Sequence, residues 1–324
     1  MKDKFDLIIM VTKKDISLLS LSIPYIRRYI KAFNVICVGK EILKSEIEKL
    51  GVFFLNEDDV FEGMTLQKVR KLISDRGGDD KRAGWYFQQF LKITYCYICP
   101  DDYYVVWDAD TIPLSRIEYF RDDKPLLMKK KEYHKPYFDT INILFDGSIG
   151  RYDKNVSFIA ENMIINKKIM IEMIDVIQKN DKIKGNNVYE KIINSISPND
   201  LNKSGFSEFE TYGNYIMFNH PFEVELIHRN SIRIGAFVVG YHPNSAQLDW
   251  IGKRYEIISI ENKSNNIIST IWATWFSLFT KSKLFRITND PYNVAKHCIK
   301  IINFQNLLHG RKNNIDYDID IEQN

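Results

Sequence analysis

Short apolar runs and amphipathic segments alternate along the N-terminal part of the chain. The run FDLIIMVT at residues 5–12 is almost continuously apolar and rich in β-branched residues, which is typical of a strand covered on both faces. Apolar residues then recur at helical spacing through DISLLSLSIPYIRRYI. Such alternation favours a doubly wound α/β sheet, whose ligands bind at the carboxyl ends of the strands. The pattern predicts strands at 5–12, 33–39 and 52–55, with helices at 15–30 and 41–50 between them.

A fourth predicted strand, YYVVW at residues 103–107, runs directly into two carboxylates. Asp108 lies at its carboxyl end, and strand alternation places Asp110 on the same side, so we expect both side chains to point into the ligand crevice. Two anions this close repel each other unless a proton or a cation intervenes. Mg²⁺ or Mn²⁺ would relieve that repulsion, with substrate phosphates completing the coordination sphere. The alternative for a D-x-D tripeptide is a surface turn or a helix cap.

A polar loop with two glycines precedes the helix that leads to this strand. Lys81 and Arg82 end the loop, and GWYFQQFLKITYCYI is predicted to form a helix that packs on the sheet. Cationic side chains beside a helix N-terminus could bind a diphosphate, although an ordinary basic loop explains them equally well. Gln88 lies on the first turns of this helix and could contact donor hydroxyls or the acceptor.

Two later segments combine regular structure with acidic residues. SFIAENMIIN is predicted to be a strand followed by a helix from about Lys167. In GFSEFETYGNYIMF, Ser207 is a predicted N-cap, and Glu208 and Glu210 fall in the first helical turn. Acids at that position stabilise the helix dipole, which explains them without catalysis. Residues two apart do not share a helix face, so at most one of the two glutamates should point into a site.

Composition and charge limit the classes of function. The chain has 324 residues, of which 45% are hydrophobic, enough for a large core in one domain or two coupled ones. The formal net charge is only +3 and the basic residues are dispersed, so we expect no nucleic-acid partner. Cys96 and Cys99 are the only close cysteine pair, and we expect buried, inert thiols. No apolar run has the length of a signal peptide core or a membrane span, so we expect a cytoplasmic protein.

Three motifs in order resemble those of a known enzyme family. The strand ending in VVWDADTIPL is similar to the D-x-D motif of GT-A fold glycosyltransferases. The preceding GWYFQQFLK and the later FSEFETYGNY resemble more narrowly a group of bacterial GT-A-type proteins associated with surface polysaccharide assembly. The resemblance covers about residues 5–245. It implies a GT-A-like, Rossmann-like mixed sheet flanked by helices.

The resemblance also implies a nucleotide-diphosphate sugar as donor and Mn²⁺ or Mg²⁺ as the metal that holds its diphosphate. Metal ligands would be Asp108 and Asp110, with His242 as a third ligand at the end of SIRIGAFVVGYHPN, which we predict to be a strand. Solvated loop charges are the alternative for the acids and lysines near the donor. The implied contacts to the donor nucleotide are Thr12, Lys13, Asp58, Asp59, Lys81, Arg82, Gln88 and Asp108.

The second half of the resembling region would bind the acceptor and carry the catalytic base. In GT-A folds a strand comparable to SFIAENMIIN passes beneath the donor sugar, which implies substrate contacts from Glu161 and Asn162. An inverting transferase needs a carboxylate that removes the acceptor proton, for which Glu208 is the first candidate and Glu210 the second. A retaining enzyme would need no such base.

Beyond residue 250 the resemblance fades into two predicted helices with aromatic and basic residues. We expect a catalytic domain at 1–250, divided into a nucleotide-sugar-binding half at 1–115 and an acceptor half at 116–250, and a helical extension at 251–324. The extension could dock on the catalytic domain or contact a membrane peripherally at the inner face of the cell membrane.

The resulting prediction is a metal-dependent glycosyltransferase that acts on a glycan or lipid-linked glycan of a bacterial capsule, lipopolysaccharide or related polysaccharide, with inversion slightly favoured. The alternatives, in order, are a retaining glycosyltransferase, a sugar nucleotidyltransferase and a non-catalytic nucleotide- or sugar-binding module. A nucleotidyltransferase ranks low because no glycine-rich basic loop follows the first strand.

Overall fold

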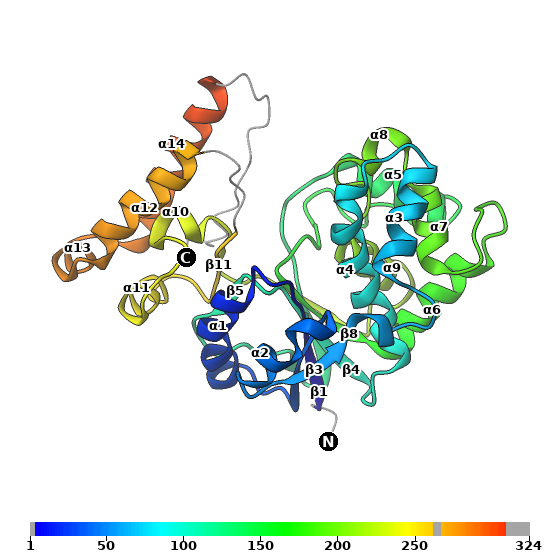
Figure 1. The fold of residues 1–324 in the computed structure, drawn as a ribbon, viewed down its shortest axis with the longest axis horizontal. Coiled ribbons are helices and arrows are strands. Elements are labelled where there is room, and N and C mark those ends of the chain that lie inside the picture. The colour runs from blue at the N-terminus through cyan, green and yellow to red at the C-terminus, as the bar shows by residue number, and fades with distance from the viewer. Residues whose placement is uncertain (1–3, 262–266, 309–324) are drawn as a thin grey trace. The chain divides into compact units, whose positions relative to one another are not determined.

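The chain divides into two compact units, each assembled from segments that are distant in the sequence. The structure is a computed structural model that describes residues 4–261 and 267–308 (Figure 1). The first unit contains the residues up to Ile16 together with Ala32–Asp108 and Tyr119–Ile227. The second unit contains Ser17–Lys31, Ala109–Glu118 and the described residues from His228 onward.

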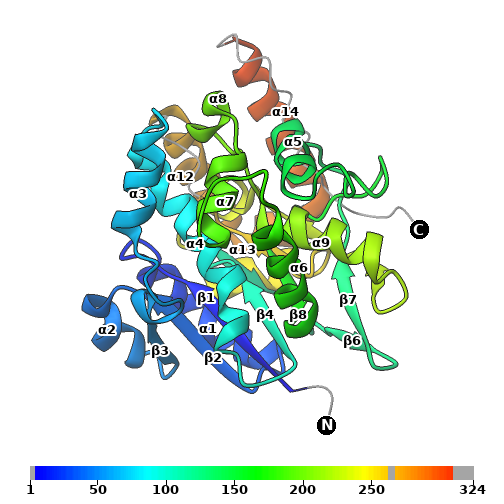
Figure 2. The ribbon, with the colours of Figure 1, turned by 90° about the vertical axis from the view of Figure 1, so that its right-hand side faces the viewer.

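A five-stranded sheet in the order β3-β2-β1-β4-β8 forms the framework of the first unit (Figure 2). Four of its strands are parallel, and β8 runs antiparallel to β4. In the register, Ile8 on β1 lies between Ile36 on β2 and Val106 on β4. The predicted mixed α/β sheet is therefore confirmed. The strands are β1 (Phe5–Met10), β2 (Asn34–Gly39), β3 (Phe53–Asn56), β4 (Tyr103–Trp107) and β8 (Asn162–Asn166).

The helices of the first unit pack around this sheet. Helix α4 packs on β1 and on α9, whereas α6 packs against β8. A smaller three-stranded sheet combines β6 (Phe120–Arg121), β7 (Lys124–Met128) and β9 (Glu225–Ile227). The helices are α2 (Lys44–Glu48), α3 (Leu66–Asp75), α4 (Ala83–Thr94), α5 (Lys135–Leu144), α6 (Lys167–Lys179), α7 (Val188–Ser195), α8 (Pro198–Leu201) and α9 (Glu208–Asn219).

The hydrophobic pattern explains why the predicted strands form. Every residue of β1 is buried, as expected for a central strand of a parallel sheet covered on both faces. The carboxyl ends of β1, β2, β3 and β4 share one edge of the sheet because these strands are parallel.

The second unit packs helices around a small sheet of β10 (Ser231–Ile232), β11 (Ile257–Ser259) and β5 (Thr111–Pro113). Its core joins Ile112, Val238, Trp250 and Ile258. The expected helical C-terminal segments are confirmed as far as Leu308, and the part of that expectation beyond residue 308 lies outside the described residues. The helices are α1 (Ile16–Tyr29), α10 (Gly235–Val239), α11 (Ser245–Ile251), α12 (Ile267–Lys281), α13 (Lys283–Thr288) and α14 (Pro291–Leu308).

The prediction of one strand running through SIRIGAFVVGYHPN is wrong. Only Ser231–Ile232 form a strand, and GAFVV folds into the helix α10. Valine-rich sequences favour strands, but burial of Ala236 and Val239 in the core outweighs that local preference. Gly240 ends the helix with a φ of 82°, a conformation that glycine adopts without strain.

All four cysteines are buried free thiols, as predicted for Cys96 and Cys99. Burial raises the pKa of the Cys99 thiol to about 11 and that of Cys37 to about 12. The thiolate that redox chemistry or metal binding requires is therefore disfavoured.

Candidate functional site

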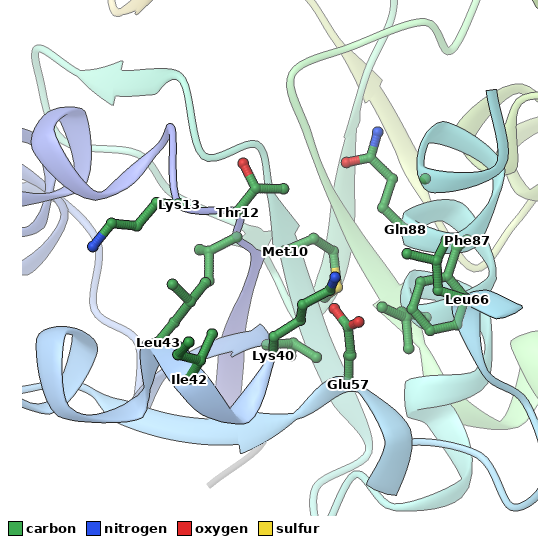
Figure 3. Close-up of a pocket in the computed structure, with 14 residues that line it drawn as sticks. Met10, Thr12, Lys13, Lys40, Ile42, Leu43, Glu57, Leu66, Phe87 and Gln88 are labelled. Atoms are coloured by element: carbon green, nitrogen blue, oxygen red, sulfur yellow. The ribbon is translucent and has the colours of Figure 1, made fainter. Parts of the chain in front are cut away.

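A pocket of about 290 Å³ opens at the carboxyl ends of β1, β2 and β3 (Figure 3). Apolar side chains line most of it, and helix α4 forms one wall. A mostly apolar pocket with a few polar groups at this edge is the usual form of a small-molecule site in an α/β sheet. The apolar lining consists of Met10, Val11, Val38, Ile42, Leu43, Leu66, Phe87 and Leu91.

Lys40 and Glu57 provide opposite charges inside this pocket, and both escaped the sequence analysis. Figure 3 shows their side chains reaching toward the same space, with Gln88 opposite them on α4. Burial raises the pKa of the Glu57 carboxyl, while Lys40 opposes that shift. The predicted acids after β3 were Asp58 and Asp59, but these residues are exposed and do not line the pocket. The half-buried Glu57 does.

Thr12 and Lys13 line the pocket where β1 ends. The backbone N–H and the hydroxyl of Thr12 donate to Oδ2 of Asp15 at 2.6 and 2.7 Å, which shapes the loop after the strand. Lys13 forms an ion pair with Glu46, and Figure 3 shows its side chain directed away from the centre of the pocket. Thr12 therefore lies at the pocket, whereas the Lys13 side chain lies at the rim and pairs with Glu46.

The basic loop before α4 contributes less than the sequence suggested. Arg82 donates to the Ser204 hydroxyl at 3.2 Å and lies over the Trp85 ring at 4.3 Å, so its guanidinium is committed to packing. Lys81 is exposed and lies 3.9 Å from Asp79. Gln88 on α4 lines the pocket.

Asp108, directly after β4, accepts a hydrogen bond from a buried lysine. Lys92 on α4 donates to Asp108 Oδ1 and to Glu208 Oε1, both at 2.8 Å. Gln88 and Lys92 are one turn apart on α4, so they lie on the same face of the helix. This face lines the pocket at Gln88 and contacts Asp108, just after β4, at Lys92. Lys92 thus lies between the Asp108 and Glu208 carboxylates, a different pair from Asp108 and Asp110, whose repulsion the sequence assigned to a metal.

Burial and neighbouring charges shift the pKa values of Asp108 and Lys92. Burial raises the pKa of Asp108, and the Lys92 ammonium opposes that shift. Burial lowers the pKa of Lys92, but the two carboxylates outweigh it and the net pKa is raised. Lys92 therefore stays protonated at neutral pH.

Glu161 and Asn162 lie at the start of β8, beside the end of β4. The backbone carbonyl of Glu161 accepts from the Asp108 N–H at 3.0 Å, and its carboxylate pairs with the buried Lys130 at 3.1 Å. Asn162 Oδ1 accepts from the Tyr119 hydroxyl at 3.0 Å. The structure thus brings this predicted pair next to Asp108.

Glu208 and Glu210 point in different directions, as helical geometry required. Ser207 caps α9 as predicted by accepting from the Glu210 N–H. Glu208 accepts from Lys92, whereas Glu210 Oε2 accepts from the Ser157 hydroxyl at 2.8 Å and the Phe158 N–H at 3.0 Å. Asn214 donates to Glu210 Oε1 at 3.0 Å. Both carboxylates therefore accept hydrogen bonds from other residues of the protein.

Asp110 and His242 belong to the second unit, whereas Asp108 belongs to the first. Strand β4 ends at Trp107, and Ala109 and Asp110 form a turn, so strand alternation does not extend to Asp110 and the placement of Asp108 and Asp110 on one side stays a prediction. The Asp110 carbonyl accepts from the Ile260 N–H at 2.8 Å. His242 is exposed after α10. Within the described residues, no three His, Cys, Asp or Glu side chains are grouped to hold a metal ion.

Lys92 is the main residue that sequence reasoning missed. Its signal was weak: a lysine among apolar neighbours in FQQFLKIT, which also fits a basic residue in the last helical turn. Lys40 and Glu57 each follow a strand, which is the position at which an α/β sheet presents ligand contacts.

No protein-family model and no curated protein matches this sequence. Among solved structures, the apo form of mouse xyloside xylosyltransferase 1 is similar over 82% of this chain and 99% of its own, with 12% identity and a TM-score of 0.42. The glycosyltransferase GlyE of Streptococcus pneumoniae TIGR4 is similar over 92% of this chain and 64% of its own, with 12% identity and a TM-score of 0.32. Because both TM-scores are low, we argue the function from the residues of the site.

Proposed function

We propose that this protein is a metal-dependent, GT-A-like glycosyltransferase that moves a sugar from a nucleotide-diphosphate donor to a bacterial surface glycan. The observation that carries the proposal is the position of one acidic residue. Asp108 stands at the carboxyl edge of the sheet, on the same edge as a pocket of about 290 Å³. A donor with a flat base and a diphosphate matches that combination of an apolar pocket and an acidic group.

The pocket suits the nucleoside part of such a donor. Its apolar walls can contact the faces of a base, and Glu57 can accept hydrogen bonds from ribose hydroxyls. Lys40 and Gln88 supply donors at the same opening. Lys81 remains a candidate contact for the diphosphate because it is exposed just before α4.

The acidic group suits a divalent cation. Carboxylate oxygens are the ligands that Mg²⁺ and Mn²⁺ prefer, and the Asp108 side chain is partly exposed at this edge of the sheet. Asp108 and Asp110 would hold the metal, with His242 as a further ligand. A bound metal would stabilise the negative charge that develops on the leaving diphosphate.

Inversion of the anomeric configuration stays a prediction. It requires a carboxylate that accepts the proton of the acceptor hydroxyl. Glu208 and Glu210 were its candidates, and both accept hydrogen bonds within the fold. Glu161 and Asn162 remain proposed contacts to the sugar. Nuclear magnetic resonance of the product anomer would distinguish inversion from retention.

Thermal stability against nucleotide diphosphates, with and without Mn²⁺, tests the proposal. A ligand at about 100 times its Kd stabilises the native state by about 2.7 kcal/mol. We expect one nucleotide to raise the Tm of the wild type only with Mn²⁺, and Asp110→Asn to abolish that response. Asp181→Asn, which removes an exposed acid on another loop, is the matched control.

Two results would contradict the proposal. If no nucleotide raises the Tm while a reference transferase responds, the donor site is refuted. If a nucleotide binds but mass spectrometry finds neither donor hydrolysis nor sugar transfer across a donor panel, the chain is a non-catalytic binding module.

We also propose that the second unit contacts an anionic membrane through α12 and α13, which would bring a lipid-linked acceptor to the enzyme. The segment 267–289 contains Lys281, Lys283 and Arg286 and no acidic residue. Exposed apolar residues combined with cations are typical of helices that lie in a membrane interface. Of the described helices, none is long and apolar enough to cross a bilayer. The exposed apolar residues are Ile271, Trp275, Leu278, Phe279, Leu284 and Ile287.

A further inference from the structure

Lys92 is a buried cation held between two carboxylates from distant parts of the chain. The residue is only 6% exposed, and its ammonium lies 2.8 Å from Asp108 Oδ1 and 2.8 Å from Glu208 Oε1. The Asp108 side chain is 34% exposed, whereas the Glu208 side chain is 8% exposed. One partner is therefore partly exposed to solvent, and the other lies inside the protein.

The surroundings leave the ammonium few other positions. Tyr104 on β4 donates its hydroxyl to the Lys92 carbonyl at 2.9 Å, which fixes the end of α4 against the strand that leads to Asp108. The ammonium also lies 4.7 Å from the centre of the Phe209 ring. Gln89 Oε1 accepts from the Glu208 N–H at 3.1 Å, so α4 and α9 are joined by side-chain contacts on both sides of the ion pair.

Stability alone does not account for this arrangement. Burying an ion pair costs desolvation energy, and well-packed apolar residues at such positions are often as stabilising. The role of the ion pair must then lie in its effect on the more exposed carboxylate, that of Asp108. The hydrogen bonds that Asp108 accepts from described residues end on Oδ1, which leaves Oδ2 for a ligand in the crevice.

We propose that Lys92 is a positioning residue that orients Asp108 toward the donor and its metal, and that Glu208 acts by holding Lys92. This inference rests on the proposed function and specifies how the site is preorganised. Groups that orient a metal ligand through a second hydrogen bond often change metal affinity strongly when they are removed. Glu208 is then not the group that accepts the acceptor proton, because its carboxylate is buried and accepts a hydrogen bond from Lys92 at 2.8 Å.

The experiment compares Lys92→Met, Lys92→Arg, Glu208→Gln and the double variant Lys92→Met/Glu208→Gln. Calorimetry gives Mn²⁺ and nucleotide-diphosphate affinities, and donor hydrolysis and transfer are measured separately. Lys191→Met is the matched control, since Lys191 is also 6% exposed in the same unit but donates to the Asn180 carbonyl, away from Asp108.

We expect Lys92→Met to weaken Mn²⁺-dependent nucleotide binding by about 10- to 100-fold. Lys92→Arg should restore part of that loss, because it keeps the cation. Glu208→Gln should weaken binding less and slow hydrolysis and transfer equally, and the double variant should bind no worse than Lys92→Met, because the two residues act in series. Lys191→Met should bind like the wild type.

Three outcomes would overturn parts of this picture, and they are distinguishable. If the wild type binds no nucleotide with Mn²⁺, the proposed function itself fails. If the wild type binds and a folded Lys92→Met binds equally well, the positioning role of Lys92 is refuted while the function stands. If Glu208→Gln keeps wild-type binding and hydrolysis but loses transfer, Glu208 is the catalytic base. Should Lys92→Met not fold, Glu208→Gln decides: wild-type Mn²⁺-dependent nucleotide binding by the folded variant refutes the positioning role.

Discussion

At the scale of single residues, Glu210 shows how a buried carboxylate can be structural although its sequence position suggests catalysis. It is fully buried on α9 and accepts hydrogen bonds from Ser157, the Phe158 backbone and Asn214. These bonds fasten the segment before β8 to α9. Burial raises the pKa of Glu210 above its usual value of 4.5, and the hydrogen bonds oppose that shift.

Glu210→Gln should therefore destabilise the protein in a pH-dependent way. An amide cannot accept all of these bonds, so we expect a loss of about 1–3 kcal/mol in the free energy of unfolding. Because the folded-state pKa is raised, the stability that Glu210 contributes is fully present below its unfolded-state pKa and declines as pH rises through the folded-state pKa. The loss should thus be larger near pH 4 than near pH 7.

Urea unfolding at the two pH values measures this difference, with the exposed Glu62→Gln as the control. An equal loss at both pH values would show that Glu210 does not titrate as its burial indicates.

At the scale of elements, the close approach of α9 to Phe158, in the segment before β8, depends on Gly213. A Cβ on Gly213 would lie 2.1 Å from the ring of Phe158, which is fully buried. Glycine within a helix normally costs stability relative to alanine. Here the space between the helix and the ring leaves no room for a methyl group.

Gly213→Ala should accordingly destabilise the protein by about 1–3 kcal/mol, as overpacking does, despite the better helix propensity of alanine. Gly84→Ala on α4 is the matched control, since a Cβ there meets nothing within 4 Å and should stabilise the helix by up to about 1 kcal/mol. Thermal unfolding of both variants checks the pair, and a stabilising Gly213→Ala would contradict the close packing of α9 on Phe158.

At the scale of the whole molecule, the chain passes from one unit to the other between the two carboxylates of the DAD motif. Asp108 ends a segment of the first unit and Ala109 begins a segment of the second. The pocket and Lys92 lie in the first unit, whereas the exposed apolar residues of α12 and α13 lie in the second. Donor binding and membrane binding should therefore respond to different substitutions.

The double variant Leu278→Glu/Leu284→Glu tests this separation. We expect the wild type to sediment with vesicles that contain phosphatidylglycerol, less so at high salt, and the variant to lose that binding. Its Mn²⁺-dependent response to nucleotides should remain. Phe222→Glu, which changes an exposed aromatic residue of the first unit, is the control. Unchanged sedimentation of the double variant would refute the membrane contact.

The sequence by itself determined the strands from β1 to β4, the helices α1, α2 and α4 between them and the Ser207 cap of α9, because periodicity and capping depend on residues within a few positions of each other. The helix α3 between β3 and β4 was not predicted. It also placed Asp108 correctly at a carboxyl end. Only the tertiary structure decided that Lys92 pairs with Asp108 and Glu208, that Glu57 lines the pocket in place of Asp58, and that GAFVV is a helix. Lys92 and Glu208 are 116 positions apart, and contacts across such separations arise from packing, which local patterns do not encode.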